Sequence, residues 1–379
     1  MTGSLKITYG KYYSVLNLKD ESGKRKQKRI PLHLEAVPGN KRKAEQAHRK
    51  ILAEYEHEQK SICRQTTLFC DYVRIWLEMK KGTIELITWE GYEEYIDLHI
   101  YPFFKKMNVN LADLSYQHLQ KYYNEKKKTL SAQSLRRHHT VINQTLKMAL
   151  KDDLIANNPA EKVTLPKVEK FTGKFLSVEQ GNVLLEVSKG KTMETAIILA
   201  MMYGLRRSEI AGLKWSAIDF TNNTIAIKHT VTQHKTTVAK DKTKNKSSNR
   251  ILPLNSQVKE FLLKMQARQN NEKQLFGRDY KNTEYICRWA DGHAMQCNYI
   301  TKGFKNILVK YGLPANIRFH DLRHSCASYM LKAGCSMKEI ADWLGHADIS
   351  TSMNIYAHLD VSAKQSVANR LGNLLSVKS

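Results

Sequence analysis

Glycines divide the C-terminal part of this chain, residues 316–360, into short helices, and this segment constrains the fold more than any other. Apolar residues recur at helical spacing over residues 322–333, and Gly334 is suited to end that helix because glycine readily adopts the left-handed conformation. A capping-box pattern that starts at Ser336 opens the next helix, which Gly345 ends. Side chains beside such helix ends can be directed into a site.

Polar residues of reactive types lie beside these helix ends. His320 and Arg323 are three residues apart, so they share one face of a helix. His346 follows the second helix, and Tyr356 lies on a further short helix. Each residue alone is more often a packed or solvated side chain than a catalytic one. Together, a guanidinium, two imidazoles and a phenol in one compact segment indicate phosphate chemistry.

Length and charge indicate a large protein with a polyanionic partner. The chain has 379 residues, enough for two or three domains. Its formal net charge of +25 favours nucleic acid, because neutralising phosphates releases counterions; an acidic membrane surface is the alternative. No apolar run approaches the roughly 20 residues of a membrane span, and no signal-peptide pattern opens the chain. The six cysteines form no C-x-x-C pair, which predicts a reducing cytoplasm.

The first 60 residues have the pattern of a small separate module. Strands are expected at residues 4–9, 11–18 and 26–34, followed by a helix over 41–59. Such a sheet, backed by one helix, is too small for a large core but can present a basic face. A solvated charged hairpin is the ordinary explanation of its basic cluster. The cluster comprises Lys24, Arg25, Lys26, Lys28 and Arg29.

A helical region is expected between a polar linker at residues 61–66 and a stop at Pro159. Its first helix is expected to bury a stripe that includes Ile75 and Met79, and its second helix to end before Pro102. The longest helix should bury one apolar face and expose a basic one. Such a face fits a clamp on the DNA backbone and a merely solvated surface about equally well. The residues placed off the apolar stripe are Arg136, Arg137, His138 and Lys147.

A lysine-rich linker that contains proline, residues 161–174, separates the helical region from the rest of the chain. An apolar helix over residues 194–203 is then broken by a glycine, and Arg206 lies in the turn that follows. Strands are expected at residues 224–231 and 250–254, with a lysine-rich hairpin tip between them.

Two motifs of this chain resemble those of a known family. The sequence reads H-D-L-R at residues 320–323 and L-G-H at 344–346, and Tyr356 follows ten residues later. An earlier segment, residues 204–215, reads G-L-R-R-S-E-I-A-G-L-K-W. These segments resemble the two boxes of the tyrosine recombinases, the phage integrase family. The family patterns are G-L-R-x-S-E-I-x-x-L-x-W and then H-x-x-R, L-G-H and a tyrosine.

The resemblance implies a multidomain α+β protein. Residues 1–60 would be a three-stranded sheet plus helix that binds arm-type DNA sites. Residues 67–160 would be a helical, SAM-like core-binding bundle. Residues 173–379 would be a mixed, mainly helical catalytic domain with a small antiparallel sheet.

The activity implied by the resemblance is site-specific DNA recombination without a metal or cofactor. Tyr356 would attack the DNA phosphate and form a covalent 3′-phosphotyrosyl link. Arg206 and Arg323 would hold the phosphate oxygens. His320 would assist proton removal, and His346 would donate a hydrogen bond to the phosphate.

Two further residues are assigned by the same resemblance. Glu209 would orient the first arginine rather than react. The family's general-acid lysine precedes a K-x-x-x-S-x-R-x-x-P pattern, and counting back from Arg250 and Pro253 selects Lys244. Lys242 is the rival if the turn is two residues longer.

The implied partners are double-stranded DNA attachment sites of a phage or mobile element, in the cytoplasm and nucleoid of a bacterium. Strand exchange between two duplexes would need a tetramer, with the C-terminal helix at residues 362–375 docked on a neighbouring protomer or on its own domain. An excisionase or a host DNA-bending protein would be an accessory factor, and no membrane partner is expected.

Three other functions are weighed against this one. A type IB topoisomerase uses similar residues but relaxes DNA without dependence on sequence. A catalytically inactive DNA-binding regulator would lack some of the six reactive side chains. A metallohydrolase is suggested by the spacing of His320 and His324, although no acidic partner accompanies them. Which element and which attachment sites are involved does not follow from the sequence.

Overall fold

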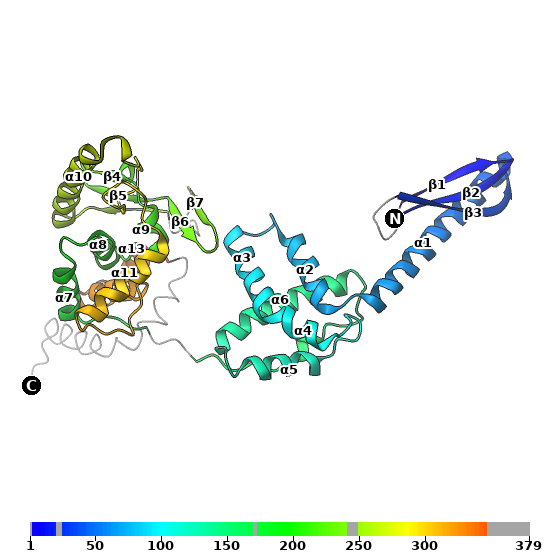
Figure 1. The fold of residues 1–379 in the computed structure, drawn as a ribbon, viewed down its shortest axis with the longest axis horizontal. Helices are drawn as coiled ribbons and strands as arrows, with labels where there is room; N and C mark the ends of the chain where they lie inside the picture. The colour runs from blue at the N-terminus through cyan, green and yellow to red at the C-terminus, as the bar shows by residue number, and fades with distance from the viewer. Residues whose placement is uncertain (1, 20–24, 170–172, 241–248, 347–379) are drawn as a thin grey trace, which may run out of the picture. The chain divides into compact units, whose positions relative to one another are not determined.

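The computed structural model divides the chain into two compact units, which meet in sequence between Val168 and Glu169 (Figure 1). No helix of the described residues is long and apolar enough to cross a membrane. The structure describes residues 2–19, 25–169, 173–240 and 249–346.

The first unit begins with a three-stranded antiparallel sheet in the order β1-β2-β3 (Figure 1). Its strands, β1 (Thr2–Thr8), β2 (Lys11–Lys19) and β3 (Arg25–Glu35), confirm the predicted sheet. A short turn of 3-10 helix, η1 (Pro38–Asn40), leads into helix α1 (Lys41–Thr66), which contacts all three strands.

The prediction of a polar linker at residues 61–66 is wrong, because helix α1 continues through Thr66. The segment S-I-C-R-Q-T contains neither proline nor glycine, so nothing in it interrupts the backbone hydrogen bonds of a helix. Polarity alone therefore did not mark a boundary.

A helical bundle fills the rest of the first unit. Its core consists of aromatic and aliphatic side chains, and Trp76, Tyr122 and Phe104 are among the largest fully buried ones. The short 3-10 helix η3 (Pro159–Lys162) follows the last helix. The bundle helices are α2 (Phe69–Lys80), α3 (Leu86–Tyr95), α4 (Tyr101–Met107), α5 (Tyr116–Lys126) and α6 (Ala132–Lys151).

The helix expected to end before Pro102 instead passes through it. A π-helical turn, η2 (Ile96–Ile100), joins α3 to α4, and the amide of Tyr101 bonds five residues back to Ile96. Pro102 is the second residue of α4, directly after the π-helical turn, where the hydrogen-bond pattern changes and a missing N–H is tolerated. The proline therefore marks a change of helix type and not an end.

Burial differs from the predicted stripes at three bundle residues. Ile75 is 49% exposed and Met79 is 59% exposed, whereas Tyr72 and Trp76 of the same helix are buried. His138, which was assigned to the solvated face, is 1% exposed. Its Nδ1 shares a hydrogen bond of 2.8 Å with the hydroxyl of a buried tyrosine, so a polar residue could enter the core.

The second unit places seven described helices around two small sheets (Figure 1). Its core is mostly aliphatic and centres on helix α8. The helices are α7 (Val178–Ser188), α8 (Glu194–Tyr203), α9 (Arg207–Gly212), α10 (Ser256–Phe276), α11 (Cys297–Lys310), α12 (Asp321–Lys332) and α13 (Met337–Leu344), with 3-10 turns η4 (Trp215–Ala217) and η6 (Gly277–Asp279).

The strand predicted over residues 224–231 is two strands in separate sheets. Strand β5 (Thr224–Ile227) pairs with β4 (Ile218–Asp219) and β8 (Arg250–Pro253). Strand β6 (Thr230–Gln233) instead pairs with β7 (Thr237–Lys240). A Cβ atom on Gly212 would lie 2.8 Å from the Cα atom of Thr230, so the end of α9 packs directly on β6. This close packing separates β6 from β5.

Candidate active site

Helix α12 carries Arg323 into the core of the second unit. Residues 321–328 are all buried, and the side chain of Arg323 is 2% exposed. His320 is the N-cap of this helix and is exposed. Arg318 donates from Nη2 to Oδ1 of the buried Asp321 at 2.7 Å, and its backbone N–H donates to the same carboxylate. The start of the helix is therefore fixed.

Gly204 lets the end of helix α8 approach α12 and α13 closely. Its φ of +59° is left-handed, and an added Cβ atom would lie 2.2 Å from Cδ2 of Leu344 and 3.6 Å from Cγ of Arg323. Only glycine fits both the conformation and the space. Arg206 follows as the N-cap of α9, where it forms a capping box with Glu209.

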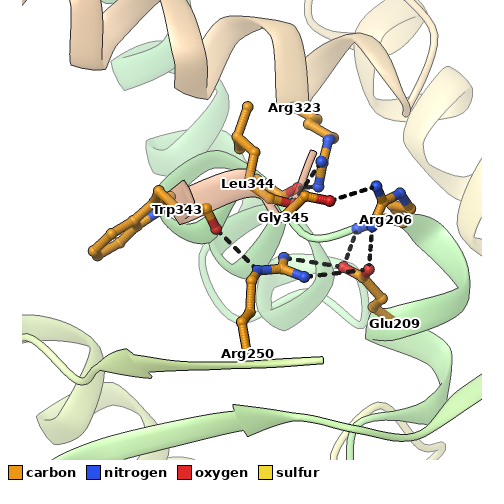
Figure 2. Close-up of polar contacts among 8 residues, drawn as sticks. Arg206, Glu209, Arg250, Arg323, Trp343, Leu344 and Gly345 are labelled. Carbon is orange, nitrogen blue, oxygen red and sulfur yellow. Dashed lines mark hydrogen bonds and ion pairs between the residues drawn. The ribbon is translucent and has the colours of Figure 1, made fainter. Parts of the chain in front are cut away.

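Glu209 is a buried carboxylate, 1% exposed, that holds two arginines (Figure 2). Arg206 donates from Nη1 to Oε1 at 2.6 Å, and Arg250 donates from Nη2 to Oε2 at 3.2 Å. Burial by itself would raise the pKa of Glu209, but the charges of Arg250 and Arg206 outweigh burial and lower it. Glu209 is therefore ionised and fixes both guanidinium groups.

Arg323 is held by backbone carbonyls. It donates from Nη1 to the carbonyl of Gly204 at 2.7 Å. It also donates from Nη2 to the carbonyl of Leu344 at 2.6 Å (Figure 2). Burial lowers the pKa of Arg323 to about 9, and the positive charge of Arg206 acts in the same direction. Arg206 also donates from Nη2 to the carbonyl of Gly345 at 3.2 Å. Both arginines thus converge on the turn that ends α13.

Three histidines lie in this positive region. The pKa of His346 is lowered to about 4, first by burial and then by the charges of Arg323 and Arg206. The pKa of His320 is also lowered to about 4: the protein around its ring removes part of the water there, although the residue as a whole stays exposed, and His324 and Arg323 are near. The rings of His320 and His324 meet edge to face with centroids 5.5 Å apart. These imidazoles are therefore neutral near pH 7.

The structure brings most of the predicted catalytic residues into one region. Arg206, Glu209, Arg323 and His346 meet through hydrogen bonds or charge, and His320 lies one turn before Arg323. The next residue, Arg207, has a different partner: its Nη1 donates to the hydroxyl of Thr301 on α11 at 2.7 Å. The other predicted catalytic residues, Lys244, Lys242 and Tyr356, and the helix expected at residues 362–375 lie outside the described residues.

Arg250 is a further residue of this site, although in the sequence it stands out only as part of the K-x-x-x-S-x-R-x-x-P pattern. Its side chain reaches from β8 to Glu209 and to the carbonyl of Trp343 (Figure 2). A burial pattern that alternates along β8 points Arg250 and Leu252 inward. Arginine is rarely buried unless it is paired, so an arginine at an inward position of a short strand indicates a buried ion pair.

The basic cluster of the N-terminal sheet divides between the two faces of the sheet. Lys28 is paired with Leu16 on the face toward α1, and its Nζ donates to Tyr55 of that helix. Arg29 is paired with Val15 and is exposed on the opposite face. Lys26 lies on the same face as Lys28. Lys24 lies outside the described residues, as does the side chain of Arg25.

Two of the basic residues predicted for the outer face of helix α6, Arg136 and Arg137, are exposed. Arg136 donates from Nη2 to the carbonyl of Pro166 at 3.3 Å, and Arg137 points to solvent beside it. Within the part of the chain that the structure describes, no three His, Cys, Asp or Glu residues gather in a way that could hold a metal ion.

Family models match both units of the chain. Residues 174–363 match the phage integrase family, and residues 68–127 match the N-terminal SAM-like domain of phage integrases. The second match covers helices of the bundle, and the first covers the region that holds the buried arginines.

Relatives and solved structures agree with these matches. The chain is 26% identical to a XerC-like tyrosine recombinase of Caldanaerobacter subterraneus subsp. tengcongensis over 80% of this chain and 82% of that protein. It is 25% identical to the integrase of Staphylococcus phage L54a over 71% of this chain and 82% of that protein. The transposon Tn1549 integrase, solved with a circular intermediate DNA, has the same fold, with a TM-score of 0.68 at 18% identity over 81% of this chain and all of that one.

Fold, arginine site and relatives together define a site-specific tyrosine recombinase, an enzyme that breaks and rejoins DNA strands. The chain belongs to the phage integrase family.

Proposed function

We propose that this recombinase integrates and excises a phage or mobile element through a covalent 3′-phosphotyrosyl intermediate. The observation that carries the proposal is the convergence of Arg206 and Arg323 on one turn, beside His346. Arg206 and Arg250 bind the carboxylate of Glu209, and Arg323 is near enough to feel its charge. Among these described residues, three guanidinium groups therefore share one carboxylate. A bound phosphodiester would offset this excess of positive charge.

The reaction uses two arginines to stabilise negative charge and a phenol to attack. Tyr356 attacks the scissile phosphorus, the P–O5′ bond breaks, and a 3′-phosphotyrosyl ester and a free 5′-hydroxyl result. Arg206 and Arg323 hold the non-bridging oxygens, which become more negative in the transition state. His320 accepts the phenolic proton, because its lowered pKa keeps it neutral before the reaction. His346 donates a hydrogen bond to the phosphate.

Lys244 protonates the leaving 5′ oxygen as general acid, with Lys242 as the rival for this role. Glu209 keeps Arg206 in place through the bond at 2.6 Å. The ester conserves the energy of the broken bond, so the 5′-hydroxyl of another strand can attack it and rejoin the DNA. No metal ion or cofactor takes part in this scheme.

DNA binding is distributed over three domains in this proposal, at residues 1–60, 67–160 and 173–379. Arg29 of the sheet and Arg136 and Arg137 of the bundle contact the DNA backbone. Two duplexes are exchanged by a tetramer that assembles through the C-terminal tail, with an excisionase or a host DNA-bending protein setting the direction. The work takes place on DNA in a bacterial cytoplasm.

The test is covalent capture of DNA on this protein. Nicked duplexes that span the ends of the surrounding genetic element are incubated with the protein in chelator and run on a denaturing gel. A retarded protein–DNA band that disappears in Tyr356→Phe, while that variant still binds DNA in a native gel, supports the proposal. Adduct formation by Tyr356→Phe would contradict the assignment of the nucleophile.

Two outcomes separate the alternatives. A protein that binds DNA but gives no adduct, even with the second attachment site added, is a regulator. A protein that cleaves and relaxes supercoiled DNA of any sequence is a topoisomerase.

A further inference from the structure

Arg250 lies on β8 at the edge of the arginine site and is buried. Its Nη1 and Nη2 donate to the two carboxylate oxygens of Glu209 at 3.4 and 3.2 Å. Its Nε donates to the carbonyl of Trp343 at 2.9 Å (Figure 2). One side chain thus contacts both the partner of Arg206 and the end of helix α13.

Three successive carbonyls at the end of α13 each accept a hydrogen bond from a different arginine. The last carbonyls of a helix lack intrahelical donors and carry partial negative charge, so cations bind well there. The next residue is His346, so these bonds hold the backbone from which its side chain projects. The pairs are Arg250 with Trp343, Arg323 with Leu344, and Arg206 with Gly345 (Figure 2).

We propose that Arg250 is a positioning residue for the reaction: it fixes Arg206 through Glu209 and fixes the turn of His346 through the Trp343 carbonyl. The inference rests on the proposed function, because it assigns Arg250 to the same phosphate site. Arg250 is buried, so its proposed role is exerted through these neighbours and not through a contact with DNA.

A guanidinium is required at this position for geometric reasons. Arg250 donates in two directions at once, with the Nη atoms toward the carboxylate and Nε toward the carbonyl. A lysine would keep the positive charge beside Glu209, but its single ammonium group cannot reproduce this planar fork. Arg250→Lys therefore separates the charge of the residue from its positioning role.

The experiment measures single-turnover formation of the covalent adduct on nicked duplex DNA, at saturating protein and well below the unfolding temperature. Arg250→Lys is expected to slow adduct formation by about 100-fold, the cost of an ångström-scale displacement of catalytic groups. Its DNA dissociation constant is expected to stay within about twofold of wild type, because a buried residue makes no contact with the backbone phosphates. A purely structural role would not separate rate from binding in this way.

A double-variant cycle tests the route of the effect. If Arg250 acts through Glu209, the rate loss caused by Arg250→Lys shrinks when Glu209→Gln is already present. The matched control is Arg288→Lys, which removes a guanidinium of the same unit that donates to the carbonyl of Thr283 and lies over the ring of Tyr280. That control is expected to cleave at the wild-type rate.

The outcomes distinguish this inference from the proposed function. No adduct with wild-type protein overturns the proposed function and the inference with it. A wild-type adduct together with an unslowed Arg250→Lys, or losses that simply add in the double variant, overturns the inference alone. A rate loss that is sub-additive with Glu209→Gln at unchanged DNA affinity supports it.

Discussion

Arg206 and Arg207 are adjacent residues with opposite surroundings. Arg206 is bound to the buried Glu209 and to the Gly345 carbonyl, whereas Arg207 donates to a threonine hydroxyl on α11. Two guanidinium groups that look equivalent in sequence therefore have different partners. The buried carboxylate makes the difference, since it fixes only one of them.

This contrast predicts the behaviour of two matched variants. Arg206→Lys is expected to lower the rate of covalent adduct formation by about 100- to 1,000-fold, because an ammonium cannot bind Glu209 and the phosphate as a fork. Arg207→Lys is expected to stay near the wild-type rate. Single-turnover cleavage of nicked DNA measures both. Equal losses in the two variants would contradict the assignment of Arg206.

At the scale of elements, the site depends on how closely helices α8, α12 and α13 meet. Gly204 sits at this meeting point with a left-handed φ and no room for a Cβ atom beside Leu344. Gly190 has a similar φ of +70°, but nothing lies within 4 Å of its added Cβ atom. A side chain at position 190 would therefore meet backbone strain alone, whereas one at position 204 would meet strain and a steric clash.

Gly204→Ala is expected to destabilise the second unit by about 3 kcal/mol, because strain and overpacking add. Gly190→Ala is expected to cost about 1 kcal/mol from strain alone. Hydrogen exchange of peptides from α8 and α12 measures the difference. Similar losses of stability in both variants would mean that the clash with Leu344 does not contribute to the destabilisation.

The bundle contains a histidine that is buried in its neutral form. Burial lowers the pKa of His138 to about 4, first by desolvation and then through His99 and Lys126. In the unfolded chain the pKa returns to an ordinary value of about 6.5. The unfolded state therefore binds more protons between these values, and stability is lost as pH falls through this window.

The bundle should lose about 3 kcal/mol of stability from His138 alone between pH 7 and pH 4. His138→Gln should remove this part of the pH dependence, because an amide does not titrate in this range. Hydrogen exchange of peptides from α5 and α6, followed at several pH values, measures the stability of the bundle separately from that of the second unit. Identical pH profiles for the two proteins would exclude His138 as the cause.

At the scale of the whole molecule, the net charge of +25 makes DNA affinity depend on salt. Arg29→Gln is expected to reduce the slope of log affinity against log salt by about one, because it removes one exposed cation. Lys28→Gln is the control, since Lys28 already bonds to Tyr55 and should change the slope less. Titrations of DNA binding at several salt concentrations compare them. Equal slopes in the two variants would mean that the open face of the sheet does not contact DNA.

The sequence by itself determined several helix ends beside the arginine site. The capping box at Ser336 and the left-handed glycines at positions 204 and 345 lie where their patterns predicted. These features depend on a few neighbouring residues, because a helix begins with a satisfied N–H and ends where glycine can turn. Arg206 and Arg323 could be selected because their segments resemble the two boxes of the family.

Only the tertiary structure decided which residues meet. The Arg323 bond to Gly204 joins residues 119 apart, and the Arg250 bond to Trp343 joins residues 93 apart. Burial of His138 and the division of residues 224–231 between two sheets were likewise settled by partners distant in sequence. Local pattern cannot encode such contacts, because the partner that satisfies a buried charge or strand edge is known only once the chain has packed.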